Sequence, residues 1–238
     1  MPLSLREYVS SHALKVPAYL ERYERHFESI RQEVRAVFEL GIHEGGSLLM
    51  WRDYFPNAII AGLDFNPVNL ADDSGRLRIY RGSQDDAPLL DRIAAECAPS
   101  GFDIVIDDCA HVGELAKKTF WRIFDHHLKS SGIYVLEDWG TGYWDQWDDG
   151  RHFEPEPDRL VSSRKEPRKV EFRSHLTGMP GFIKQLIDEC ALTDIRLGGS
   201  SYQSPHKLIG RLEIAMGQVF VYPFKECAWL PEPVMSQP

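Results

Sequence analysis

The chain of 238 residues contains little cysteine and no long apolar run. Its four cysteines are too sparse for a disulfide scaffold, and their spacing shows no C-x-x-C pattern of a zinc site. Reduced thiols in a cytoplasmic protein are the simplest interpretation. No apolar stretch approaches the ~18 residues of a membrane span, and the first residues lack the apolar core of a signal peptide. The cysteines are Cys97, Cys109, Cys190 and Cys227.

Basic side chains are in deficit as well. The sequence has 27 Lys and Arg against 36 Asp and Glu, which gives a formal net charge of −9. Nucleic acids and anionic membranes are also negative, so this chain is a poor candidate for binding either of them. Hydrophobic residues at 43% and charged residues at 26% are ordinary for a globular protein and exclude a largely disordered chain.

Short apolar runs alternate with helical stretches along the chain from Val34 onward. This alternation predicts an α/β, Rossmann-like fold with a mostly parallel seven-stranded sheet. Ser47 and Asp86 are placed as N-caps of helices, and Gly217 is placed as the turn of a C-terminal antiparallel hairpin. The predicted strands are 34–40, 58–63, 77–80, 102–106, 132–136, 208–216 and 218–222, and the predicted helices are 47–54, 87–97, 112–128 and 180–190.

We expect one main domain with appendages. Residues 1–33 are predicted to form an N-terminal helical extension, residues 34–225 the α/β domain, and residues 226–238 a C-terminal tail. Residues 145–175 are rich in charged residues and proline and form a lid-like insert in this prediction, because long irregular segments often cover a functional site.

Glycines follow the first predicted strand, where parallel sheets bind ligands. Gly41, Gly45 and Gly46 allow a tight turn, and Asp64 ends the second strand about 20 residues further on, a spacing suited to binding ribose hydroxyls. His43 stands where a dinucleotide fingerprint has its second glycine. It therefore disfavours NAD and favours S-adenosylmethionine (SAM), which has no pyrophosphate. A strand–helix turn without a ligand is the alternative for the glycines alone.

Acidic side chains follow the fourth and fifth strands. Asp107, Asp108 and His111 belong to IDDCAH, and Glu137 and Asp138 belong to LEDWGTGYW. Neighbouring strand ends lie side by side, so we expect these side chains to gather. Neither motif contains a Lys or Arg to neutralise the carboxylates. A divalent cation is therefore indicated, and oxygen ligands favour Mg²⁺, Mn²⁺ or Ca²⁺. Helix capping is the alternative for one Asp alone.

These segments resemble the metal-dependent SAM O-methyltransferases of antibiotic biosynthesis. That family includes the sugar methyltransferases of macrolide and tetracenomycin pathways and the related cephalosporin-modifying enzymes. The resemblance covers about residues 19–144, with a weaker similarity in GMPGFIKQLID. Cys109 stands where the family tends to have glycine, and the segment 147–173 matches nothing in it. The motifs are ELGIHEGGSLLMWRDYFPNAIIAGLDFNP, RGSQDD, DIVIDDCAH and VLEDWGTGYW, in that order.

The resemblance implies a role for each residue of these motifs. It implies that Asp108, Glu137 and Asp138 hold Mg²⁺ and that His111 is the general base. Direct metal binding or helix capping are the alternatives for the histidine. The residues implied to line the SAM pocket are Glu39, Gly41, Ser47, Asp64, Gln84 and Asp107.

Two groups of aromatic residues flank these motifs. Tyr143 and Trp144 are candidates for stacking on a substrate, with packing of the lid as the alternative. Tyr19 and Tyr23 lie four residues apart on a predicted helix and therefore share a face. That face either covers the cofactor or packs in the core.

Together these features predict a SAM- and divalent-metal-dependent O-methyltransferase. Its acceptor is a small-molecule hydroxyl, on a sugar or a glycosylated natural product. A catechol or phenol O-methyltransferase and a non-catalytic SAM-binding protein are the alternatives, and a panel of acceptors distinguishes them. Enzymes of this resemblance often assemble, so a homo-oligomer with contacts through the N-terminal helices is expected by analogy.

Overall fold

A computed structural model of the chain describes residues 4–8, 15–151, 176–197 and 204–225. Two of the predicted segments lie largely or wholly outside these ranges. Residues 152–175, which make up most of the predicted lid-like insert, and the predicted tail 226–238 lie outside the described residues.

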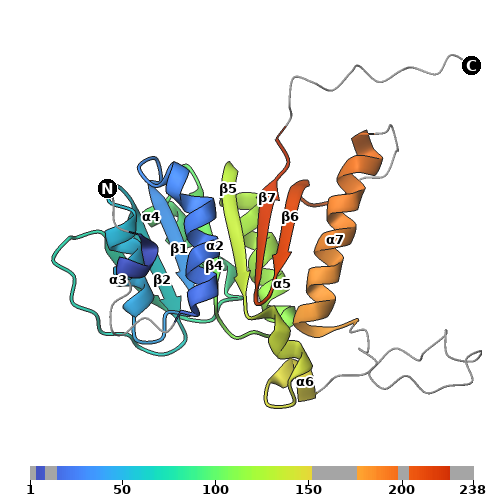
Figure 1. The fold of residues 1–238 in the computed structure, drawn as a ribbon, viewed down its shortest axis with the longest axis horizontal. Helices are drawn as coiled ribbons and strands as arrows, with labels where there is room; N and C mark the ends of the chain where they lie inside the picture. The colour runs from blue at the N-terminus through green and yellow to red at the C-terminus, as the bar shows by residue number, and fades with distance from the viewer. Residues whose placement is uncertain (1–3, 9–14, 152–175, 198–203, 226–238) are drawn as a thin grey trace, which may run out of the picture.

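One seven-stranded sheet forms the centre of the molecule (Figure 1). Its strands are β1 (Ala36–Leu40), β2 (Ile59–Asp64), β3 (Leu77–Arg81), β4 (Phe102–Asp107), β5 (Leu128–Glu137), β6 (Ile209–Ala215) and β7 (Gln218–Pro223). They run in the order β3-β2-β1-β4-β5-β7-β6. The first five are parallel, and β7 is antiparallel to both β5 and β6. The predicted mostly parallel sheet with a C-terminal hairpin is confirmed.

Helices cover both faces of this sheet. Three pack on one face: α1 (Leu5–Tyr8), α2 (Pro17–Phe27), which continues into η1 (Glu28–Ile30), and α3 (Gly46–Tyr54). On the other face lie α4 (Ala87–Cys97), α5 (Gly113–His126) and α7 (Gly178–Leu197). Val37 and Phe38 of β1 belong to opposite cores, which explains the apolar run of this central strand. Among the described residues, no helix has both the length and the apolar character needed to cross a membrane.

Helix α2 is anchored firmly to the sheet. It begins with Pro17, a residue suited to the first turn of a helix, and it buries Tyr19, Leu20, Tyr23 and Phe27. Burying one large apolar side chain contributes about 1.5–3 kcal/mol. The position of α2 over the sheet is therefore well determined, and the side chains that it carries are held at defined places.

Most observed element ends lie within two residues of the predicted ones, with larger differences at α7 and β5 and a different cap at α3. Asp86 is confirmed as the N-cap of α4, since its carboxylate accepts from the Leu89 amide at 3.1 Å. The N-cap of α3 is not Ser47 but Gly45, which adopts a φ of 84°. Helix α7 extends beyond the predicted residue 190 to Leu197, and β5 begins four residues before 132, at Leu128.

Candidate active site

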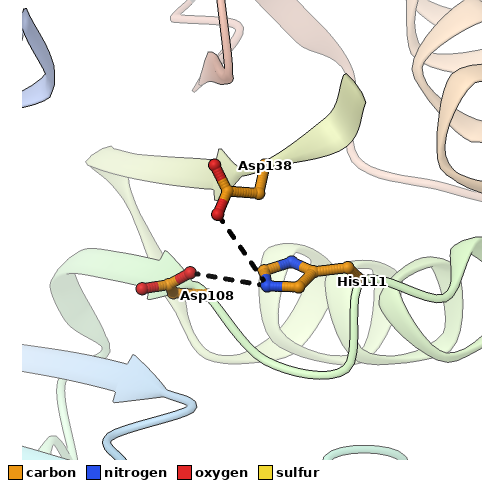
Figure 2. Close-up of side chains that lie close together, drawn as sticks. All are labelled: Asp108, His111 and Asp138. Carbon is orange, nitrogen blue, oxygen red and sulfur yellow. Dashed lines mark ion pairs between the residues drawn. The ribbon is translucent and has the colours of Figure 1, made fainter. Parts of the chain in front are cut away.

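Two carboxylates and an imidazole meet at the edge of the sheet where β4 and β5 end. Asp108 follows β4, Asp138 follows β5, and His111 lies in the loop that leads into α5. Figure 2 shows the imidazole facing both carboxylates. His111 Nε2 lies 3.8 Å from Asp108 Oδ1 and 4.0 Å from Asp138 Oδ2. One ligand atom of each residue lies within 4.8 Å of the others, a spacing that suits a bound metal ion. Of the five side chains predicted to gather here, the structure thus brings these three together as a candidate metal group.

Two of these residues have a backbone conformation that few side chains adopt. The φ angles of His111 and Asp138 are 52° and 54°. Residues in this region cost about 1–3 kcal/mol and cluster at functional sites. At Asp138 the turn is held by local bonds, because its amide donates to the Gly217 carbonyl at 2.6 Å and its own carbonyl accepts from the Thr141 hydroxyl at 2.8 Å. The site geometry is therefore built into the backbone.

Lys15 supplies a positive charge that the sequence motifs did not reveal. Its Nζ lies 2.6 Å from Asp108 Oδ2, 3.0 Å from Glu137 Oε2 and 3.4 Å from Glu39 Oε1. The Lys15 side chain is only 5% exposed. Burial by itself would lower the pKa of Lys15, but Glu137, Asp108 and Glu39 raise that pKa well above its ordinary value. Neither motif contains a basic residue, but Lys15 from outside them supplies a cation to Asp108 and Glu137.

Glu137 lies deeper than the other two predicted metal ligands. Its side chain is buried, and its carboxylate contacts Lys15 and accepts a hydrogen bond from the Tyr23 hydroxyl. Burial raises the pKa of Glu137 above its ordinary value, and the charge of Asp108 adds to that effect. Asp108 has one oxygen facing this inner group and the other facing His111 and Asp138. The two groups of carboxylates are thus joined through Asp108.

Four of the predicted SAM-binding residues surround the turn between β1 and α3. Glu39 is fully buried, burial raises its pKa, and it accepts a 2.6 Å hydrogen bond from the Ser47 hydroxyl. Asp64 accepts from the amides of Ile42 and His43 at 3.0 Å each. Its carboxylate therefore holds the glycine turn in place at the mouth of the sheet.

Gly41 brings this turn against the end of β4. It has a φ of 81°, and a Cβ placed on it would overlap the backbone of Asp108. The glycine is thus required by its conformation and by the close approach of a residue of the site.

Gln84 and Asp107 form a second buried pair behind the site. Gln84 Oε1 accepts from the Ala110 amide at 3.0 Å, and Gln84 Nε2 donates to Thr119 Oγ1 at 3.3 Å and to Asp107 Oδ1 at 3.4 Å. The Tyr134 hydroxyl donates to Asp107 Oδ2 at 3.0 Å, and burial raises the pKa of Asp107 to about 7. In this structure the pair supports the loop that carries His111.

Aromatic residues follow Asp138 along the chain, and one of them, Trp147, contacts His111. Tyr143 and Trp144 lie in and just after η2 (Trp139–Tyr143), with 37% and 57% of each residue exposed. The ring of Trp147 meets His111 edge-on at 5.0 Å between centroids. The short helix α6 (Asp148–Arg151) follows, within a segment predicted to be irregular.

Asp149, which lies outside the predicted motifs, anchors the segment that carries these aromatic residues. Asp149 Oδ2 in α6 accepts from the amide of Gly113 at 2.8 Å and from that of Met179 at 2.6 Å. These amides lie at the N-terminal ends of α5 and α7, where unpaired N–H groups favour an anionic partner. Asp149 therefore links the segment 143–151 to the N-terminal ends of α5 and α7.

Replacing Gly41 with Ala is expected to destabilise the protein more than the same change at Gly75. Both glycines have a positive φ, but a Cβ at Gly75 meets nothing within 4 Å. The strain of a positive φ in Ala, about 1 kcal/mol or more, is common to both variants. The overlap with Asp108 is specific to Gly41. Urea unfolding of the two variants measures the difference, and equal losses of stability would contradict the close approach of Gly41 to β4.

No family model matches the chain. Among curated proteins, it is 40% identical over 133 residues to mycinamicin VI 2''-O-methyltransferase of Micromonospora griseorubida, a match that covers 53% of this chain and 32% of that protein. It is 43% identical over 128 residues to 8-demethyl-8-(2-methoxy-alpha-L-rhamnosyl)-tetracenomycin-C 3'-O-methyltransferase of Streptomyces olivaceus, covering 51% and 32%. Demethylmacrocin O-methyltransferase of Streptomyces fradiae is 38% identical over 133 residues, covering 53% and 33%.

Among solved structures, the chain is similar to the MycE methyltransferase from the mycinamycin biosynthetic pathway in complex with Mg and SAH. The TM-score is 0.72 at 28% identity, and the match covers 98% of this chain and 58% of that one. A second MycE structure, which also holds mycinamycin VI, gives a TM-score of 0.69 at 27% identity and covers 98% and 57%.

These comparisons confirm the predicted Rossmann-like SAM methyltransferase fold and the resemblance to sugar O-methyltransferases of macrolide and tetracenomycin pathways. The match spans about one third of the length of these curated relatives.

Proposed function

We propose that this chain is a SAM- and divalent-metal-dependent O-methyltransferase that acts on a hydroxyl group of a sugar or glycosylated natural product. The observation that carries the proposal is the meeting of Asp108, His111 and Asp138 at the strand ends beside the glycine turn. It combines two anionic ligands with a proton acceptor, the groups that activation of a hydroxyl requires. The similarity to sugar O-methyltransferases supports the same activity.

The side chains of the site fit a divalent cation. Carboxylate oxygens are the ligands that Mg²⁺ and Mn²⁺ prefer, and the pairing of the Lys15 ammonium with Asp108 and Glu137 supports a cationic partner for these groups. Asp108, Glu137 and Asp138 would hold the metal. A bound divalent cation would lower the pKa of a coordinated substrate hydroxyl. MycE, which was solved with Mg, supports this assignment by similarity.

The turn after β1 fits the cationic and hydroxyl groups of SAM. Glu39 Oε1 is buried and meets no hydrogen-bond donor in good geometry among the described residues, and the Lys15 ammonium lies 3.4 Å from it. Such an oxygen favours a positively charged partner, and SAM carries both an ammonium and a sulfonium. Asp64 stands at the end of β2, where a carboxylate suits ribose hydroxyls. SAM supplies an electrophilic methyl group, and these residues orient it.

His111 is placed to accept the proton of the acceptor hydroxyl at Nε2. The two carboxylates that face this nitrogen would stabilise the imidazolium that forms. The ring of Trp147 packs against the imidazole, with the two ring planes 77° apart. Tyr143 and Trp144 follow Asp138 closely in the chain, and their exposed rings offer apolar faces for a sugar.

The test is calorimetric titration of SAM, and then of Mn²⁺, into the metal-stripped protein. The wild type is expected to bind both. Asp64→Asn should weaken SAM binding about tenfold or more, because a hydrogen bond to a charged group contributes about 1.5–3 kcal/mol. Asp138→Asn should abolish the Mn²⁺ site while keeping a residue type that tolerates a positive φ.

Asp103→Asn is the matched control. Asp103 lies at the start of β4, at the opposite edge of the sheet, where it pairs with Lys129 at 2.7 Å. This variant should bind SAM and Mn²⁺ as the wild type does. Failure of the wild type to bind SAM would contradict the proposed activity. With both sites established, a panel of glycosylated and catechol acceptors tests the substrate class, and exclusive methylation of catechols would overturn the sugar assignment.

A further inference from the structure

Helix α2 brings two hydroxyl groups to the two carboxylates at the end of β5. The Tyr19 hydroxyl donates to Asp138 Oδ1 at 2.6 Å, and the Tyr23 hydroxyl donates to Glu137 Oε1. The two tyrosines stand four residues apart on one face of the helix. They are 6% and 0% exposed, so both rings are held by packing. The positions of these hydroxyls are therefore set by the core and not by the carboxylates.

Each hydrogen bond holds one carboxylate, and at Asp138 it also determines which oxygen faces His111. With Oδ1 of Asp138 bound to Tyr19, Oδ2 is the oxygen that lies 4.0 Å from His111 Nε2. At Glu137, Oε1 accepts from the Tyr23 hydroxyl, and Oε1 and Oε2 each lie 3.0 Å from Lys15 Nζ, so Tyr23 helps to hold the whole carboxylate in place. The side chain of Asp138 is 40% exposed, so its rotation is otherwise little restricted by packing.

The hairpin between β6 and β7 leaves the space that Tyr19 needs. Gly217 forms its turn with a φ of 74°, and a Cβ there would overlap the Tyr19 hydroxyl. The Gly217 carbonyl accepts from the Asp138 amide at 2.6 Å. Arg22, on the same helix as Tyr19, donates to the Met216 carbonyl and to Gln218 Oε1, each at 2.7 Å. The hairpin thus contacts both the Tyr19 hydroxyl, which donates the hydrogen bond, and Asp138, which accepts it.

From these contacts we propose that Tyr19 and Tyr23 are positioning residues that orient Asp138 and Glu137 toward the metal ion. The proposal rests on the proposed function, because it assigns the two carboxylates as metal ligands. Partners that fix the orientation of metal ligands typically contribute 10–100-fold to metal affinity. The two tyrosines act through the carboxylates, and they make α2 a structural part of the metal site.

The experiment measures Mn²⁺ binding by calorimetry in the full chain without SAM. Tyr19→Phe and Tyr23→Phe remove only the hydroxyls and keep the rings, including the 5.1 Å edge contact of Tyr23 with Trp51. Each variant should bind Mn²⁺ about 10–100-fold more weakly than the wild type. Tyr222→Phe is the matched control, since it removes a hydroxyl that joins the same helix to β7 through His26 Nδ1 at 2.7 Å, away from the carboxylates.

Thermal unfolding separates positioning from a purely structural role. Tyr19→Phe and Tyr222→Phe should lower the melting temperature to a similar extent, and only the first should lower Mn²⁺ affinity. Wild-type affinity in Tyr19→Phe, or an equal loss in Tyr222→Phe, would overturn the proposal. If Tyr23→Phe does not fold, Tyr19→Phe alone decides. A wild type that binds SAM but no Mn²⁺ would instead remove the metal from the proposed function, and the positioning role would fall with it.

Discussion

Replacing Lys15 with Met is expected to lower the free energy of unfolding of the metal-free protein by about 3 kcal/mol. Removing one partner of a buried ion pair typically costs about 3–5 kcal/mol, because the remaining charge is left uncompensated. Lys15 is the cation within 3.4 Å of Glu39, Asp108 and Glu137. Two of these carboxylates are buried, and without the ammonium they must be protonated or repel each other. Urea unfolding in the presence of a chelator measures the loss.

A divalent cation should reverse this loss of stability. Mn²⁺ placed among the same carboxylates restores the missing charge, and a ligand that binds only the folded state stabilises it by RT ln(1 + [L]/Kd). Mn²⁺ should therefore stabilise Lys15→Met more than it stabilises the wild type, in which the ammonium competes for Asp108 and Glu137. Lys129→Met, which breaks the 2.7 Å pair with Asp103 at the other edge of the sheet, is the control. Equal stabilisation of all three proteins would show that Lys15 and the metal do not share these carboxylates.

The fold could be predicted because its signals are local. A central parallel strand is buried on both faces, and for this reason the sequence of β1 is an apolar run that only Glu39 interrupts. The hairpin at Gly217 carries its own turn residue. The meeting of Asp108, His111 and Asp138 also follows from the sequence, because β4 and β5 are neighbours and each motif stands at the same end of its strand.

The contacts that complete the site have no local signal. Lys15 reaches Asp108 across 93 positions and Glu137 across 122, and Tyr19 reaches Asp138 across 119. Such pairings depend on where α2 packs on the sheet, and sequence spacing does not encode that placement. Ser47 illustrates a related limit. A serine before an apolar helix is a typical N-cap, but the buried carboxylate of Glu39 binds its hydroxyl, and Gly45 takes the capping position.

Replacing His111 with Asn is expected to lower kcat by about 10²–10⁴-fold, the usual contribution of a general base. Asn tolerates the positive φ of this position, so the loop should keep its conformation. SAM binding should be unchanged. Methyl transfer is measured with an acceptor identified in the panel, and His127→Asn is the control, because that histidine pairs with Asp91 at 2.7 Å beyond the C-terminal end of α5.

The affinity of His111→Asn for Mn²⁺ decides between two roles of the imidazole. His111 Nε2 is 3.8 Å and 4.0 Å from the nearest carboxylate oxygens, close enough to share a cation with them or to accept a proton beside it. A proton acceptor leaves Mn²⁺ binding intact and loses only turnover, whereas a ligand loses both together. Lost turnover at wild-type Mn²⁺ affinity would therefore support base catalysis. A parallel fall in Mn²⁺ affinity would assign His111 to the metal, and the proton would then have to leave by way of another group.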